Sequence, residues 1–144
     1  MLPLLTRIDH VGIACRDLNK AIELYQATFG LKVVSVETNE AQGVREAMLG
    51  VGDRTLLPGY IQLLEPLGPD TPVGKFLARR GEGLHHVGYG VADIGEALSA
   101  LGATGLRLID ERPRHGSMGA SIAFLHPADL GGVLTELVQS VTAT

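Results

Sequence analysis

Five polar side chains occupy strand positions whose neighbours on the same face are apolar or glycine. They are His10, Glu46, Gln62, His86 and Glu136. Successive strand residues point to opposite faces, so residues two positions apart share a face. This pattern puts Ile8 beside His10 and Leu84 beside His86. A buried polar group lowers stability unless it has partners. One such residue is often a hydrogen-bonded core group, whereas five together favour a functional site.

The chain contains an internal repeat, because residues 7–34 and residues 83–109 carry the same pattern. The motif DHVGIAC in the first copy corresponds to HHVGYGV in the second, which aligns His10 with His86. Towards the ends of the two halves, YIQLLEP resembles VLTELVQ, and a shift of one residue between the two segments aligns Gln62 with Glu136. Two halves that share one backbone plan explain these matches.

Each half is predicted to fold as a strand, a helix and three further strands. Asp17 and Asp93 are suited to cap the N-termini of the helices, and Gly30 and Gly102 lie where the helices are expected to end. The expected strands are residues 8–14, 32–36, 44–49 and 60–65 in the first half, and 84–91, 107–110, 120–125 and 133–138 in the second. The predicted fold class is therefore α+β, with two tandem βαβββ modules forming a cupped mixed sheet.

We expect one domain over residues 1–144, with module one at about residues 5–66 and module two at about residues 83–140. Residues 67–82 form the linker, in which Pro72 is suited to the first turn of a short helix that ends near Arg80. A chain of this length buries a sizeable core without disulfides. Cys15 is the only cysteine, and we expect it to be an inert buried thiol.

The repeat predicts a geometry for the polar residues. His10 and His86 occupy equivalent positions in the first strands, and Gln62 and Glu136 occupy equivalent positions in the last strands. A pseudo-twofold arrangement would bring two imidazoles and two oxygen donors together. Such a set suits a divalent cation such as zinc, cobalt, nickel, manganese or iron, with positions left for a substrate. A lone strand histidine is more often a core or surface residue, so the hypothesis depends on the pairing.

These residues and motifs resemble the vicinal oxygen chelate (glyoxalase) superfamily and, within it, the methylmalonyl-CoA epimerase family. The resemblance covers nearly the whole chain and includes DHVGIAC, EAQGVREAML, YIQLLEP, LHHVGYGV and FLHPADLGGVLTELVQ. It implies that His10, Gln62, His86 and Glu136 hold a divalent metal cation. Co²⁺ is the expected ion, with Zn²⁺, Mn²⁺ or Ni²⁺ as alternatives. The resemblance also implies that Glu46 is a catalytic acid/base.

The implied reaction interconverts (2R)- and (2S)-methylmalonyl-CoA by removing and returning the α-proton through a metal-stabilised enolate. Glu46 is the expected base on one face of the α-carbon. On the other face the candidates are Glu136, shifting away from the metal, or a bound water. A solvated residue on an edge strand is the alternative interpretation of Glu46, because single charges on one strand face are common.

Other functions fit the same fold. A glyoxalase I-like lyase would act on a glutathione hemithioacetal, but such enzymes usually have Glu where this chain has Gln62. An extradiol dioxygenase would use two histidines and one carboxylate, and Gln62 would crowd its iron. A small-molecule binding protein without chemistry usually lacks the metal-binding set.

The composition limits the partners. The formal net charge is −4 and no basic run stands out, so we expect no nucleic acid. No apolar run is long enough to cross a membrane, and we expect a cytoplasmic protein that forms a homodimer. The expected partner is an acyl-CoA substrate. Five basic residues could approach its phosphates without any being assigned to them, namely Lys75, Arg79, Arg80, Arg112 and Arg114.

Overall fold

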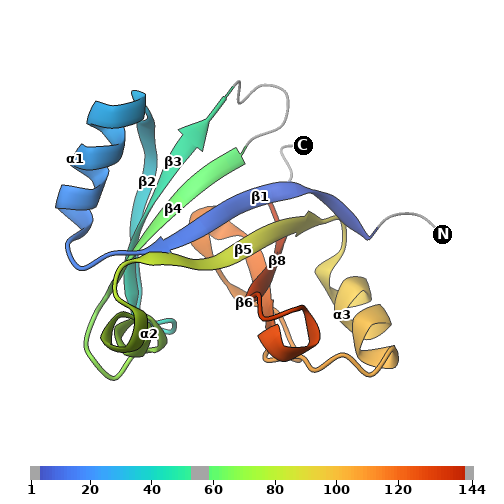
Figure 1. Cartoon of the computed structure of the whole chain (residues 1–144). Helices are drawn as coiled ribbons and strands as arrows, with labels where there is room; N and C mark the ends of the chain where they lie inside the picture. The colour runs from blue at the N-terminus through green and yellow to red at the C-terminus, as the bar shows by residue number, and fades with distance from the viewer. Residues whose placement is uncertain (1–3, 53–58, 142–144) are drawn as a thin grey trace. The chain divides into compact units, whose positions relative to one another are not determined.

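A computed structural model describes residues 4–52 and 59–141 of the chain. The first half contains β1 (Leu5–Ala14), α1 (Leu18–Phe29), β2 (Lys32–Asn39), β3 (Val44–Val51) and β4 (Gly59–Pro66). Helix α2 (Pro72–Arg80) follows, and the second half contains β5 (Gly83–Val91), α3 (Ile94–Ala103), β6 (Arg114–His115), β7 (Ser121–Leu125) and β8 (Thr135–Gln139) (Figure 1). The predicted α+β class and the repeated βαβββ order are confirmed.

Internal contacts divide the chain into two compact units. One unit spans His10–His85, and the other combines the chain up to Asp9 with the chain from His86 onward. Strands β1 and β5 therefore each run through one boundary. We call the two parts the contiguous unit and the split unit. The module limits expected from the sequence, residues 5–66 and 83–140, remain a prediction.

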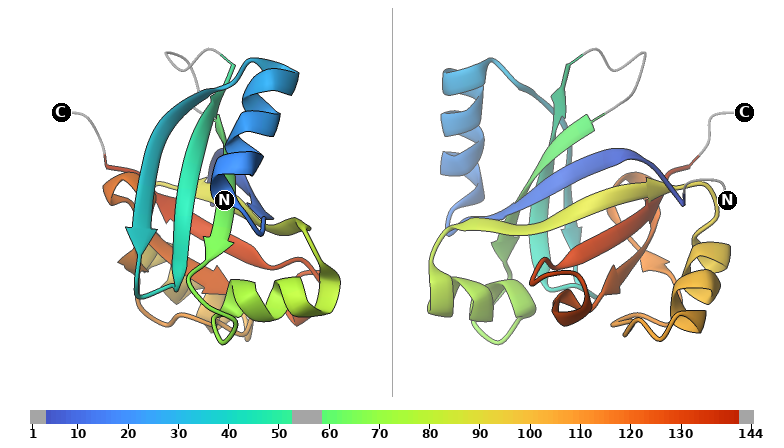
Figure 2. Two further views of the ribbon diagram at one scale, coloured as in Figure 1. Left: turned by 90° about the vertical axis from the view of Figure 1, so that its left-hand side faces the viewer. Right: turned by 45° about the vertical axis from the view of Figure 1, so that its right-hand side comes forward.

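In the contiguous unit the strand order is β2-β3-β4-β1. Strand β3 is antiparallel to both β2 and β4, whereas β1 runs parallel to β4. Helix α1 covers one face, where Leu18 packs with Leu49 and Leu63. Helix α2 lies on the opposite face, where Val73 and Leu77 pack with the sheet. Figures 1 and 2 show α1 running alongside β2, β3 and β4, with α2 at one end of these strands.

In the split unit the strand order is β5-β8-β7-β6. Strand β5 runs parallel to β8, and the pairs β8–β7 and β7–β6 are antiparallel. Helix α3 covers one face, where Leu98 packs with Leu125 and Leu137. A second apolar cluster, formed by Ala120, Ile122, Phe124 and Val138, lies apart from that helix. Each unit is therefore built on a mixed sheet. Helices α1 and α2 cover opposite faces in the contiguous unit, and α3 covers one face in the split unit.

The helix ends agree with the sequence except at one position. Asp17 and Asp93 accept hydrogen bonds from the first turns of α1 and α3, and Gly30 ends α1 in a left-handed conformation. The prediction that α3 ends at Gly102 is wrong, because α3 continues to Ala103. The Thr104 hydroxyl donates to the Leu101 carbonyl, so the last turn needs no glycine there. Among the described helices, none has the length and apolar character that a membrane span requires.

The prediction of a strand at residues 107–110 is wrong. Only an isolated bridge joins Leu108 to Leu125. The Arg107 backbone and guanidinium both donate to the Asp129 carboxylate, and the amides of Ile109 and Asp110 share one acceptor, the Phe124 carbonyl. These bonds take the donors that a regular ladder would use, so the paired strand forms later, at β6.

Candidate functional site

Glu46 lies buried in the middle of the contiguous unit. Residues 44, 46 and 48 of β3 share a face with residues 62 and 64 of β4, and we call this the Glu46 face. The register places Glu46 opposite Leu64 and Met48 opposite Gln62, so Glu46 and Gln62 are diagonal neighbours. Gln62 Nε2 donates to Glu46 Oε2 at 2.9 Å. Glu46 is 3% exposed and lies on a strand with a neighbouring strand on each side. This excludes the alternative interpretation of Glu46 as a solvated residue on an edge strand.

His10 belongs to the same face of the contiguous unit. In β1, His10, Gly12 and Ala14 alternate, and Ala14 packs in the cluster that contains Leu64. Gly12 stands opposite Gln62 in the parallel register. The imidazole of His10 is buried, with 3% of the residue exposed. The sheet therefore brings three of the predicted residues, His10, Gln62 and Glu46, onto neighbouring strands of one face.

The exposure of Ile8 and Leu84 corrects the expected neighbours of the two histidines. Ile8 is 68% exposed while Asp9, the next residue, is buried with His10. Leu84 is 67% exposed, and His86 is buried. Ile8 and Leu84 are thus not core neighbours of these imidazoles. Asp9 and His10 alternate to opposite faces of β1 and are both buried, and an alternating sequence pattern does not report that both faces are covered there.

The split unit brings His86 and Glu136 together. Glu136 stands opposite Gly88 of β5 and Phe124 of β7, and the Phe124 ring meets the His86 imidazole edge to face at 5.4 Å. His86 Nε2 and Glu136 Oε2 lie 3.9 Å apart, and both side chains are at most 5% exposed. This distance exceeds a hydrogen bond.

The spacing fits two ligands of one ion. Metal–ligand bonds of about 2.0–2.2 Å allow two ligands to be separated by up to roughly 4 Å. The imidazole nitrogen and carboxylate oxygen of this pair are donors that a borderline divalent cation accepts. His10, His86 and Glu136 are all buried, and each offers a ligand atom of this kind. The chemistry of these donors is therefore compatible with the expected metal.

An ion pair that the sequence pattern did not indicate lies in the split unit. Arg7 donates to the buried carboxylate of Asp9 at 2.6 Å and also to the Ser140 hydroxyl. A Cβ added to Gly90 would lie 2.9 Å from the Arg7 side chain, so the glycine leaves the room that this arginine occupies. Period-two alternation assigns Asp9 to the face opposite His10, which is why the pair was missed.

His85 has different surroundings from His86. Its ring meets the ring of Phe76 in α2 edge to face, with the centroids 5.0 Å apart. Burial lowers the pKa of His85 to about 4, so the imidazole is neutral at physiological pH. These contacts belong to the packing of α2.

Cys15 lies beneath α1 and is 4% exposed. Burial, followed by the nearby charges of Glu65 and Glu82, raises the pKa of its thiol to about 12. The thiol donates to the Leu64 carbonyl at 3.4 Å. A thiol that stays protonated at neutral pH is a poor nucleophile, which confirms the inert residue expected from the sequence.

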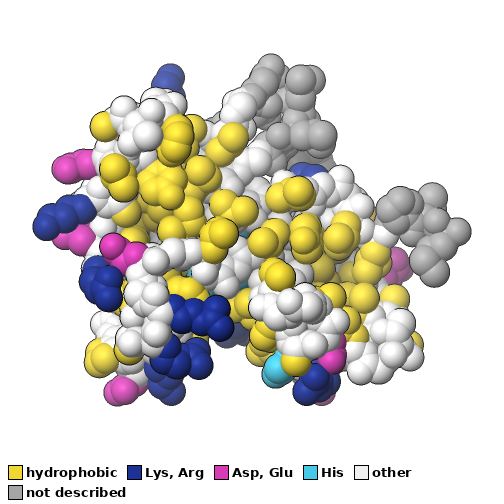
Figure 3. All heavy atoms as spheres, in the orientation of Figure 1, with side chains coloured by type: hydrophobic (Ala, Val, Ile, Leu, Met, Phe, Trp, Pro, Cys, Tyr) yellow, Lys and Arg dark blue, Asp and Glu magenta, His cyan; other side chains and the backbone are white. Residues whose placement is uncertain are grey.

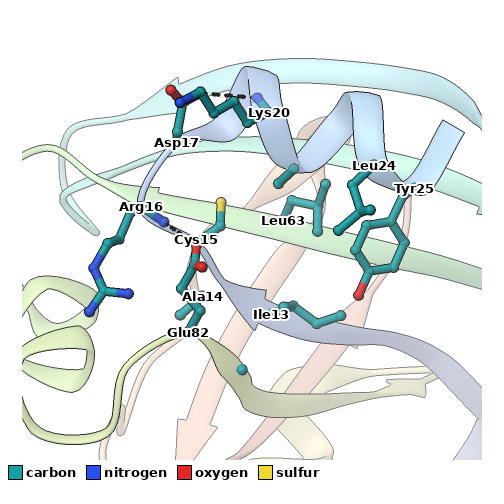
Figure 4. A pocket seen from close by; sticks show the side chains of 12 residues that line it. Ile13, Ala14, Cys15, Arg16, Asp17, Lys20, Leu24, Tyr25, Leu63 and Glu82 are labelled. Atoms are coloured by element: carbon teal, nitrogen blue, oxygen red, sulfur yellow. Dashed lines mark hydrogen bonds between the residues drawn. The ribbon is translucent and has the colours of Figure 1, made fainter. Parts of the chain in front are cut away.

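A hollow of about 480 Å³ opens on the other face of the contiguous unit. Figure 4 shows it between α1 and β1, with Ile13, Cys15 and Leu63 at its floor and Leu24 and Tyr25 along the helix. These floor residues point away from the Glu46 face because they alternate with Gly12, Ala14 and Gln62. None of the predicted site residues lines this hollow, so it is separate from the candidate site.

Comparisons with known proteins agree on one group. Residues 9–124 match the model of the Glyoxalase/Bleomycin resistance protein/Dioxygenase superfamily. The chain is 36% identical to an ethylmalonyl-CoA/methylmalonyl-CoA epimerase of Cereibacter sphaeroides, over 92% of this chain and 97% of that protein.

Solved structures agree with this match. A methylmalonyl-CoA epimerase in complex with methylmalonyl-CoA and NH4+ is 52% identical, with a TM-score of 0.92 over 96% of both chains. The methylmalonyl-CoA epimerase from Mycobacterium tuberculosis is 41% identical, with a TM-score of 0.91 over 99% of this chain and 94% of that one. Coverage is nearly complete on both sides, so the likeness concerns the whole fold.

Proposed function

Because the chain belongs to the Glyoxalase/Bleomycin resistance protein/Dioxygenase superfamily and, within it, to the methylmalonyl-CoA epimerase family, we propose that it is an isomerase that interconverts (2R)- and (2S)-methylmalonyl-CoA. The reaction removes the proton from the carbon between the thioester and the carboxylate and returns a proton to the opposite face. The observation that carries the proposal is Glu46, a buried carboxylate held by Gln62 within the matching fold.

Glu46 is the proposed base on one face of the α-carbon. Its surroundings, which include Val44 and Met48, keep bulk water away from the carboxylate. The amide of Gln62 fixes the position of one carboxylate oxygen. A positioned carboxylate of this kind contributes about 10²- to 10⁴-fold to proton transfer.

Four residues are the proposed holders of a divalent cation, namely His10, Gln62, His86 and Glu136. Support comes from their burial, from the 3.9 Å separation of His86 Nε2 and Glu136 Oε2, and from the donor types. A bound divalent cation supplies a Lewis acid that polarises the thioester carbonyl and offsets the charge left when the proton departs. Co²⁺ is the ion we propose, with Zn²⁺, Mn²⁺ and Ni²⁺ as alternatives.

Glu136 is the proposed partner of Glu46 in proton transfer. One carboxylate oxygen can face the cation while the other holds or releases a proton, because a carboxylate has two acceptor oxygens. The α-proton goes to Glu46, and Glu136 or a water that it orients gives a proton to the opposite face. The proton delivered is therefore not the one removed, and once the acids exchange with solvent the product carries a solvent-derived proton in either direction of turnover.

The test is exchange in heavy water. The metal-loaded protein is incubated with one epimer of methylmalonyl-CoA in D₂O, and the α-position is followed by NMR and mass spectrometry. Deuterium should enter that carbon as the other epimer accumulates. Turnover of a glutathione hemithioacetal without exchange would instead favour the glyoxalase I-like lyase. Absence of both reactions would favour a binding protein without chemistry.

Gel filtration with light scattering tests the proposed homodimer, and cell fractionation tests the proposed cytoplasmic location.

A further inference from the structure

We propose that Arg80, at the end of α2, binds a phosphate of the substrate's coenzyme A, with Arg79 and Lys75 adding to the positive field. This inference rests on the proposed function and names a phosphate subsite for it.

Helix α2 lies on the same face of the sheet as Glu46. Its Val73 and Leu77 form a cluster with Val44, Leu64 and Ala14. Leu64 stands directly opposite Glu46 in the antiparallel register and directly opposite Ala14 in the parallel one. The apolar side of α2 therefore closes the end of the row that contains the proposed base. A substrate bound at Glu46 must have this helix as a wall.

The position of α2 is held on both sides by close packing. Gly43 has a φ of +71°, and an added Cβ there would lie 2.6 Å from the Thr71 methyl carbon. A Cβ on Gly74 would lie 2.3 Å from the Gly68 carbonyl oxygen. Both distances are shorter than van der Waals contact, so only glycine fits at these positions. The helix, and with it Arg80, is a fixed feature of this face.

Arg80 is exposed and lies at the C-terminal end of the stripe of α2 that packs on the sheet. It follows Leu77 by three residues and Phe76 by four, which are the spacings that put helix residues on one side. The guanidinium carbon lies 6.0 Å from the centre of the Phe76 ring, and Phe76 packs against the cluster that contains Leu64. This contact holds the cation at the rim of the Glu46 face.

Arg79 and Lys75 flank this stripe. They are four residues apart on the exposed side of α2. Among the residues that the structure describes, no carboxylate forms an ion pair with Lys75, Arg79 or Arg80. Basic residues in the last turn do offset the dipole of a helix C-terminus. That effect requires no contact with Phe76, and it gives no reason for Lys75, which lies near the start of the helix.

The surface charge supports an anionic ligand. The chain has a formal net charge of −4, yet Lys and Arg side chains gather over α2 (Figure 3). Figure 4 shows the Arg16 side chain leaving the outer hollow towards the same helix. Coenzyme A carries its negative charges on phosphates at the end of a long neutral arm. The protein would then contact both ends of the acyl-coenzyme A, with the thioester at Glu46 and the phosphates at α2.

The experiment compares Arg80→Glu with Lys32→Glu, an equal charge change at an exposed residue of β2 in the same unit. Coenzyme A and 3′-dephospho-coenzyme A are titrated into each protein by calorimetry at two salt concentrations. We expect Arg80→Glu to weaken the binding of coenzyme A by about 10-fold or more and to reduce its salt dependence. Lys32→Glu should bind as the wild type does. An equal effect on dephospho-coenzyme A would point to the pyrophosphate, and a smaller one to the 3′-phosphate.

Kinetics provide a second measurement. Arg80→Gln should raise KM for methylmalonyl-CoA and leave kcat unchanged, because the phosphates do not react. With a methylmalonyl pantetheine thioester, which lacks the nucleotide, the variant and the wild type should be equal. Equal losses with both substrates would overturn the phosphate contact.

The two proposals fail separately. Binding of coenzyme A that depends on Arg80, without epimerisation, would retain this subsite and reject the proposed reaction. Epimerisation with binding that is the same in the wild type, Arg80→Glu and Lys32→Glu would reject the subsite and retain the reaction. Wild-type protein that fails to bind coenzyme A at all would overturn the subsite directly.

Discussion

The two halves of the chain pair their strands in equivalent registers but carry different side chains at equivalent positions. In the first half Gln62 pairs with Met48, and Glu46 lies on the next row opposite Leu64. In the second half Glu136 pairs with Phe124, and Ile122 lies on the next row opposite Val138. Ile122 thus occupies the position that corresponds to Glu46. Each half has a donor on its last strand, and at the neighbouring equivalent position the first half carries Glu46 where the second carries Ile122.

Gln62 and Glu136, the donors on the two last strands, also have different neighbours. Gln62 donates to a carboxylate, so its neutral amide holds a charge that could serve as a base. Glu136 has an imidazole 3.9 Å away and an aromatic ring beside that imidazole. The first half therefore has a carboxylate held by an amide, and the second half has an imidazole and a carboxylate at the spacing of two metal ligands. This difference leads to four predictions, ordered from the largest expected effect to the smallest.

Removing the carboxylate of Glu46 should have the largest effect. Glu46→Gln retains the shape of the side chain and its contact with Gln62, so the fold and metal content should persist. The rate of α-deuterium exchange should fall by about 10²- to 10⁴-fold. Glu96→Gln on the exposed side of α3 is the matched control. Exchange that survives in Glu46→Gln would mean that the difference between the halves has no catalytic meaning.

The cores behind the two faces should be equally important. Leu63 and Leu137 are the buried partners on the helix-covered faces, at 0% and 1% exposed. Replacing either with alanine should lower the free energy of unfolding by about 2–5 kcal/mol, measured by urea denaturation. Leu24→Ala, at a residue 62% exposed, should change it little. A loss below 1 kcal/mol at one of the two sites would show that the halves are packed unequally.

Making the two donors alike should weaken metal binding. Glu136→Gln gives the second half the amide of the first and removes one negative charge from the proposed ligand set. The affinity for Co²⁺ or Zn²⁺, measured by competition with a chromophoric chelator, should fall by about 10- to 100-fold. Ile122→Val serves as a control on the same face. Unchanged affinity in Glu136→Gln would remove Glu136 from the ligand set.

Exchanging equivalent buried residues should have the smallest effect. Cys15→Val introduces the residue that Val91 provides in the second half, and both positions are 4% exposed. The stability at neutral pH should change by less than about 1.5 kcal/mol. A larger loss at that pH would show that the packing around residue 15 is specific to the thiol.

The same pair of proteins should differ more at alkaline pH. The folded thiol keeps its proton until about pH 12, whereas the unfolded thiol loses it near pH 9.0. Its contribution is therefore complete below pH 9 and is lost as the pH rises towards 12. Unfolding curves from pH 8 to 10 should show the wild type losing stability relative to Cys15→Val. Parallel curves would contradict the shifted pKa.

The repeat and the polar residues on apolar faces were enough to predict the secondary structure order and the burial of all five candidates. Periodicity reports which residues share a face, so Glu46, Gln62 and Glu136 could be found from spacing. It could not report that Ile8 and Leu84 are exposed while His10 and His86 are buried, because alternation alone does not say where along a strand a face is covered. The irregular segment after α3 was also missed, since the side-chain bonds from Arg107 to Asp129 join residues distant in sequence.

The division of the chain at Asp9 and His85 has a consequence for how the molecule is made. The unit that spans His10–His85 is continuous, so all of its partners exist once that stretch has been synthesised. The other unit joins the first strand segment to residues beyond His86, and the bond from Arg7 to Ser140 closes it. Contacts between distant segments form slowly because a long loop must close first. During translation, the part that carries Glu46 should therefore be folded before the part that carries Glu136.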